Sequence, residues 1–160
     1  MKIVKLNTAL TVIFVVVSVL AVTIFSSPLR KLVAIVDLLL FAVGVATFIW
    51  GYFSAVQRSR SDEISVAGLF LLIDGVATNS VKRIMNSALI IQVVVGLGGA
   101  LVRRSTNGVS GSTLAFGVLV PLLGLGLNGL WASKNGTFGR RIVPEGSASQ
   151  EEIGKDSAHG

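Results

Sequence analysis

The sequence predicts an all-α membrane protein with four transmembrane helices. Of its 160 residues, 52% are apolar and only 14% are charged, whereas a soluble domain usually has about 25% charged residues. The mean hydropathy is +0.79. Four stretches reach the roughly 20 apolar residues that a helix needs to cross a hydrocarbon core of about 30 Å. They cover residues 8–25, 32–53, 84–102 and 113–132.

The first of these stretches predicts a helix that stays part of the protein. Lys2 and Lys5 precede it, as basic residues precede the apolar core of a signal peptide. Its apolar run is longer than the roughly 7–15 residues of such a core. Bulky Ile24 and Phe25 stand where a peptidase requires small residues. We therefore expect an uncleaved first helix.

Residues 64–77 form a fifth apolar stretch, which is too short to cross a membrane and belongs to a predicted helix over about residues 62–77. Its apolar residues recur at helical spacing from Val66 to Ala77 and make one continuous face. Ser61 precedes the stretch and is a suitable N-cap. The pattern predicts an interfacial amphipathic helix before the third span. A re-entrant segment, or a helix continuous with the third span, remains an alternative.

The distribution of lysine and arginine predicts the orientation. With the N-terminus inside, nine of these residues flank the spans on the inner side and four on the outer side, leaving aside the distant Lys155. The nine are Lys2, Lys5, Arg58, Arg60, Lys82, Arg83, Lys134, Arg140 and Arg141, and the four are Arg30, Lys31, Arg103 and Arg104. Because cytoplasmic loops carry the excess of positive charge, we predict a multi-pass protein of the plasma (inner) membrane with both termini in the cytoplasm.

The composition changes after the fourth span. Residues 1–133 are predicted to form the four-helix transmembrane domain, and residues 134–160 a cytoplasmic tail. The tail is rich in glycine, serine and charge, so it cannot bury enough apolar surface to offset the entropy of ordering. We expect most of it to be disordered, from about Pro144 onward.

Three of the polar residues within the spans define a candidate intramembrane polar site: Asp37, Gln92 and Asn128. A carboxylate at membrane depth is costly, so Asp37 is the first candidate for a proton or cation relay. Two structural alternatives remain open for Asp37. It lies near the outer end of its helix, where Arg30 or Lys31 could form a salt bridge with it, or where it could serve as a first-turn acid.

Small residues mark the expected contact faces of the helices, because membrane helices pack closely through glycine and alanine. Gly96 on the third span and Gly124 on the fourth belong to stripes of this kind. Pro121 lies within the fourth span, where it removes a backbone hydrogen bond and is expected to kink the helix. A packing role and a hinge role both fit these three residues.

The cations on the predicted inner surface are candidate contacts for anionic lipids. Clustered juxtamembrane cations attract anionic headgroups by about 1 kcal/mol each, although membrane topology alone would also account for them. The candidates are Arg58, Arg60, Lys82, Arg83, Arg140 and Arg141.

The sequence predicts neither an enzyme nor a cofactor or metal site. It lacks HExxH, GxSxG and phosphate-loop motifs. Cysteine is absent and the single histidine, His159, lies next to the C-terminus. Basic residues interleaved with stacking aromatics are also absent, so we expect no nucleic-acid partner.

Two passages carry a recognisable pattern. The first is QRSRSDEI at residues 57–64, which continues into GLF at 68–70. The second runs from residue 116 through Pro121 to GLGLNGLW at 124–131 and ends in GTF at 136–138. Together they resemble small four-span membrane proteins of actinobacteria that have no assigned activity. The resemblance covers about residues 5–141 and implies an inner-membrane protein, without implying any catalytic or binding residue.

These observations predict a non-enzymatic integral membrane protein that serves as an accessory or structural component. Its expected partners are the lipid bilayer and either another membrane protein or further copies of itself. The alternative is a small transporter or channel with a polar path around Asp37, Gln92 and Asn128.

Overall fold

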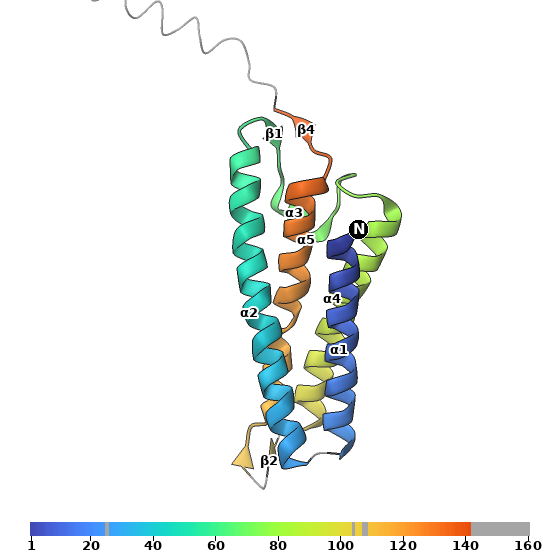
Figure 1. The fold of residues 1–160 in the computed structure, drawn as a ribbon, viewed down its shortest axis with the longest axis vertical. Coiled ribbons are helices and arrows are strands. Elements are labelled where there is room, and N and C mark those ends of the chain that lie inside the picture. The colour runs from blue at the N-terminus through green and yellow to red at the C-terminus, as the bar shows by residue number, and fades with distance from the viewer. Residues whose placement is uncertain (25, 104, 107–108, 142–160) are drawn as a thin grey trace, which may run out of the picture.

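The computed structural model describes residues 1–24, 26–103, 105–106 and 109–141, and it is a bundle of four long apolar helices (Figure 1). The helices are α1 (Lys2–Ile24), α2 (Ser27–Arg58), α4 (Asn79–Val102) and a fourth span in two parts, η1 (Thr113–Leu119) and α5 (Pro121–Asn135). All four spans are long and apolar enough to cross a membrane. The predicted fold class is therefore confirmed, and the chain is an integral membrane protein with four candidate spans.

The fourth span is the most enclosed of the four. Half of its most apolar window is buried in the bundle, against 22–28% for the other three. Those three direct large apolar side chains outward, such as Leu39 (61% exposed), Phe53 (62%) and Val94 (63%). A continuous apolar exterior of this kind fits lipid as the solvent.

Helix α2 packs along α5 through contacts between backbones. A Cβ atom added to Gly44 would lie 2.6 Å from the Leu123 nitrogen, and one added to Gly51 would lie 2.7 Å from the Leu130 nitrogen. Real Cβ atoms do not approach other atoms so closely, so only glycine permits this separation. The small residues of α2 therefore set how near the two helices lie.

Pro121 divides the fourth span instead of kinking one continuous α-helix. The residues before it form the 3-10 helix η1, and Pro121 is the first residue of α5. Proline has no N–H, so it cannot donate to the Gly117 carbonyl four residues earlier. That carbonyl accepts a hydrogen bond from the Val120 nitrogen instead, at 3.2 Å. A hydrogen bond between residues three apart, instead of four, is the pattern of a 3-10 helix.

The prediction of one helix over residues 62–77 is wrong in its extent. The segment begins with strand β1 (Asp62–Glu63), and helix α3 covers only Val66–Leu71, with Ser65 as its N-cap. Leu72 ends the helix in the left-handed conformation (φ 55°).

Helix α3 ends at Leu71 because residues of the neighbouring helices bind its last carbonyls. In a longer helix the carbonyls of Phe70 and Leu71 would accept from residues 74 and 75. They accept instead from the side-chain amides of Asn128 (2.9 Å) and Asn86 (2.8 Å).

The residues after α5 fold back onto the end of the bundle where α2 ends and β1 begins. Strand β4 (Gly139–Arg140) pairs antiparallel with β1, so that Asp62 lies opposite Arg140. We call this the β1–β4 end. The opposite end carries the short strands β2 (Ser105–Thr106) and β3 (Val109–Ser110). Part of the predicted tail, residues 134–141, is thus packed against the bundle, and the predicted disorder from Pro144 onward lies outside the described residues.

Candidate functional site

Gln92 lies at the centre of a polar cluster that joins three helices. Its Nε2 donates to Thr11 Oγ1 on α1 at 2.7 Å and lies 3.4 Å from Asn7 Oδ1. Its Oε1 accepts from the backbone nitrogen of Gly124 on α5 at 3.1 Å. Gln92 is fully buried, so these hydrogen bonds replace the water that the amide has lost. We call these four residues the Gln92 layer.

Asn128 belongs to a second cluster, nearer the β1–β4 end. Its Nδ2 donates to the carbonyl of Phe70 at 2.9 Å and to Asn86 Oδ1 at 3.1 Å. Phe70 in turn stacks on Phe48 of α2, with ring centroids 4.6 Å apart. The Asn128 layer, defined as Asn128, Asn86 and the Phe70 carbonyl, therefore anchors α3 to α4 and α5.

Asp37 lies in a third position, where all four spans meet. A Cβ atom added to Gly117 would lie 3.5 Å from Asp37 Oδ2, 3.6 Å from the Phe14 ring and 3.4 Å from the Gly96 Cα. Asp37 is 1% exposed, and neither carboxyl oxygen has a hydrogen-bond partner among the described residues. The salt bridge considered for this residue is therefore not formed by a direct contact. We call these four residues the Asp37 layer.

The three layers follow one another along the bundle. Gly96 comes four residues after Gln92 on α4, and Asn128 comes four residues after Gly124 on α5. Four helical residues rise about 6 Å, so adjacent layers are about one helical turn apart. Each layer contains a buried polar atom without a partner in the described chain: Asn7 Nδ2, Asn128 Oδ1 and both oxygens of Asp37. Asp37, Gln92 and Asn128 thus share the bundle interior, but no hydrogen bond joins any two of them.

Residues that support these layers include some that the sequence did not single out. Asn7 and Thr11 are buried, and they lie one turn apart on α1, where Thr11 Oγ1 also donates to the Asn7 carbonyl at 2.8 Å. Their spacing of four is a signal that could have identified them, because two polar residues then share one helix face.

The three residues expected at packing or hinge positions all lie inside the bundle. Gly96 faces the backbone of Gly117, and a Cβ atom on Gly124 would lie 2.7 Å from Gln92 Oε1. Pro121 begins α5 directly after η1. These contacts are made within the chain, between α4 and the two parts of the fourth span.

The candidate lipid-contacting cations differ in their surroundings. Arg58 is engaged: its Nε donates to Asp62 Oδ2 at 2.5 Å, and its guanidinium lies 5.1 Å from the centre of the Phe138 ring. Arg141 Nη1 donates to the Ser59 carbonyl at 3.3 Å while its side chain stays exposed. Arg60, Arg83 and Arg140 are exposed, and Lys82 is half-buried.

Comparison of the chain with protein-family models, curated proteins and solved structures finds no match. The resemblance to small actinobacterial membrane proteins stays a prediction. Within the part of the chain that the structure describes, no three His, Cys, Asp or Glu side chains come close enough to hold a metal ion.

Proposed function

We propose that the protein acts through its lipid-facing surface, as a non-enzymatic accessory or structural component of a membrane assembly. The supporting observation is how tightly the interior is closed. A methyl group at Gly44, Gly96 or Gly126 would overlap the backbone of the facing helix. At these positions the facing helices touch backbone to backbone, which favours recognition at the outer surface.

A groove between α1 and α4 is the surface best suited to a partner helix. It has a volume of about 280 Å³. It is lined by Ser18, Val19, Val22, Thr23, Val94, Val95, Gly98, Gly99 and Val102. A Cβ atom on Gly98 would meet nothing within 4 Å, so the backbone there is open to a neighbour. Small residues that expose helix backbone are typical of contacts between membrane helices. The proposed partner is a helix of another membrane protein or of a second copy.

The substitution Gly98→Leu tests this proposal because it fills the groove without touching the interior. We expect cross-linking to a neighbour in native membranes to fall at least fivefold, because a bulky side chain prevents close approach of backbones. Ala42→Leu is the control, since Ala42 is exposed on α2, away from the groove. Wild-type protein that extracts as a monomer without a partner in mild detergent would contradict the proposal.

A second candidate function, a small proton or cation transporter, is supported by Asp37. Ionisable residues inside membrane spans often mark ion pathways. Asp37 has no hydrogen-bond partner among the described residues, and the Gln92 and Asn128 layers continue polar groups toward the β1–β4 end. Purified protein in liposomes should then carry a proton or Na⁺ flux that Asp37→Asn abolishes and Asp74→Asn does not. A flux no greater than that of empty liposomes, or one that Asp37→Asn leaves intact, would exclude this function.

We further propose that the β1–β4 end faces the cytoplasm of the cell and that the membrane is the plasma membrane. The nine flanking cations of the predicted inner side support this orientation. Because the chain has no cysteine, Ser110→Cys introduces a single thiol at the β2–β3 end. An impermeant thiol reagent should label it in intact cells. Labelling only after lysis would reverse the orientation.

A further inference from the structure

We propose that the β1–β4 end holds an anionic phospholipid, with part of one acyl chain in a cavity between α2 and α3 and its phosphate beside Arg141 and Arg60. This site is separate from the groove between α1 and α4, and it does not depend on which partner occupies that groove.

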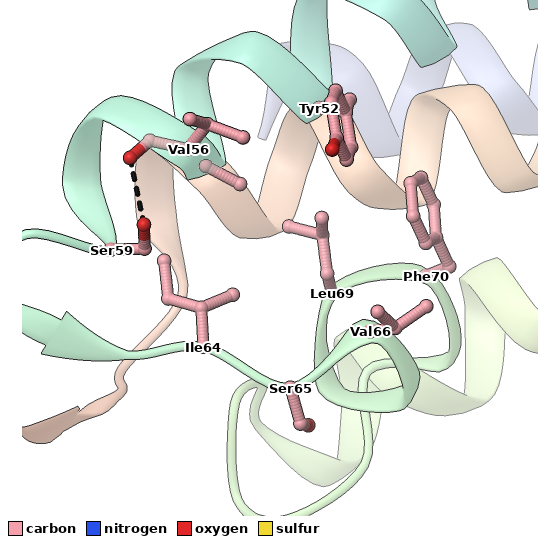
Figure 2. Close-up of a pocket in the computed structure, with 9 residues that line it drawn as sticks. Tyr52, Val56, Ser59, Ile64, Ser65, Val66, Leu69 and Phe70 are labelled. Atoms are coloured by element: carbon pink, nitrogen blue, oxygen red, sulfur yellow. Dashed lines mark hydrogen bonds between the residues drawn. The ribbon is translucent and has the colours of Figure 1, made fainter.

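The cavity is apolar and lies where α2 ends. It has a volume of about 160 Å³, and it is lined by Tyr52, Ala55, Val56, Ser59, Ile64, Ser65, Val66, Leu69 and Phe70. Figure 2 shows Tyr52 and Val56 of α2 on one side of the cavity. Ile64 and, from α3, Val66 and Leu69 lie on the other side.

The floor and the rim of the cavity differ in exposure. Ala55 and Leu69 are buried, at 4% and 3% exposure, whereas Val56 and Val66 are 46% and 73% exposed. A rim of exposed apolar side chains beside a lipid-facing helix makes the cavity accessible from the bilayer.

A polar recess adjoins the apolar cavity. It is lined by Ser59, Asp62, Glu63, Ile64 and Arg141, and it therefore shares Ser59 and Ile64 with the apolar cavity. The exposed Arg141 side chain donates to the Ser59 carbonyl at 3.3 Å, and Ser59 lines both spaces. An amphipathic ligand could thus place an apolar chain in one space and a headgroup in the other.

The charge around the recess favours an anion. Residues 58–63 and 140–141 contain four arginines and two acids, a net charge of +2. One of the acids, Asp62, is already paired with Arg58 at 2.5 Å. Within residues 58–63 and 140–141, this leaves the exposed Arg60, Arg140 and Arg141 opposed by Glu63. The recess itself is lined by Asp62, Glu63 and Arg141, so the excess of positive charge comes from the arginines that flank it. An apolar cavity next to arginines at the end of a membrane span matches the two parts of an anionic phospholipid.

The acyl-chain half of the site is tested by filling the cavity. Native mass spectrometry of the protein, purified with equal amounts of phosphatidylglycerol and phosphatidylcholine, measures which lipids stay bound. We expect Val56→Trp to reduce bound phospholipid about tenfold. Val43→Trp is the matched control, because Val43 lies on the same helix at similar exposure, 41% against 46%, outside the cavity lining. Equal lipid retention by the two variants, with equal melting temperatures, would overturn the proposal.

The headgroup half is tested by removing charge. The wild type should retain phosphatidylglycerol in preference to phosphatidylcholine by roughly tenfold. The double substitution Arg60→Gln with Arg141→Gln should abolish that preference, while Lys82→Gln with Arg83→Gln, an equal loss of charge on α4, should leave it. A preference that depends only on the number of charges removed would overturn the specific site.

The chain's own C-terminal segment is the other conceivable occupant, because residue 142 follows Arg141 directly. A chain that ends at Arg141 distinguishes the two. If phospholipid is the occupant, the shortened chain should retain as much phosphatidylglycerol as the full chain. A several-fold rise in retention would show that residues beyond Arg141 fill the cavity, and would overturn the proposal.

Discussion

Gln92 and Asp37 are both fully buried polar residues, but they differ in their hydrogen-bond partners. Each polar atom of the Gln92 amide has a partner, on α1 or on α5, so Gln92 stabilises the fold by joining three helices. Asp37 has no partner among the described residues. Its burial therefore opposes folding, and its presence is better explained by a role other than stability.

Gln92→Ala is expected to destabilise the protein by about 2 kcal/mol, because it leaves Thr11 Oγ1 and the Gly124 N–H without their partner inside the bundle. Thermal unfolding in detergent measures this. Gln57→Ala provides the control, since Gln57 is exposed on α2 and should change stability by less than about 0.5 kcal/mol. An equal effect of both substitutions would contradict the structural role of the Gln92 layer.

Asp37→Asn is expected to leave stability unchanged or to raise it by about 1 kcal/mol, because an amide is less costly than an ionised carboxylate to bury without a partner. Asp62→Asn should instead lower stability, since it removes the partner of Arg58 at 2.5 Å. The same unfolding measurement decides both. A large loss of stability in Asp37→Asn would mean that the carboxyl group holds the bundle together.

Two glycines on α4 show how a helix divides its surface between protein and lipid. A Cβ atom on Gly96 would overlap the backbone of Gly117, whereas one on Gly98 would meet nothing within 4 Å. We expect Gly96→Ala to lower stability by about 2 kcal/mol. Gly98→Ala should raise it by about 0.5 kcal/mol, because alanine is the better helix former. Unfolding in detergent compares the two variants, and a similar loss in both would contradict the packing described for α4.

The sequence predicted the long elements well and the short ones poorly, for a physical reason. A membrane span must hold about 20 apolar residues, so its length is visible without any knowledge of its neighbours. The end of α3 depends instead on Asn86 and Asn128, which are distant in the chain and donate to its last carbonyls. Periodicity within residues 62–77 contains no information about those partners.

For the candidate polar site, the sequence predicted which residues are polar but not how they are arranged. Gln92 and Asn128 stand out in the sequence because polar residues are rare in apolar spans. Their separation into different layers was not predictable, because it depends on the rotation of each helix about its axis. The missing salt bridge of Asp37 has the same origin: Arg30 comes seven residues earlier, which is close in sequence, but the carboxyl group turns toward Gly117.

At the scale of the whole molecule, the exposed apolar surface of three spans predicts how the protein fractionates. It should stay in the membrane pellet through a wash with alkaline carbonate and appear in solution only with detergent, because transfer of these helices to water is unfavourable. Immunoblotting of the fractions measures this. Folded protein in the carbonate supernatant would contradict a membrane-spanning bundle.

The pairing of α2 with α5 constrains the order in which the protein can be assembled. These two helices make the most extensive contact within the described chain, yet 62 residues separate the end of α2 at Arg58 from the start of α5 at Pro121. During synthesis, the backbone at Gly44 and Gly51 stays without its α5 partner until the fourth span leaves the translocon. Any premature stop before Pro121 would release a product without its principal helix pair, and such a product is a natural substrate for membrane quality-control proteases.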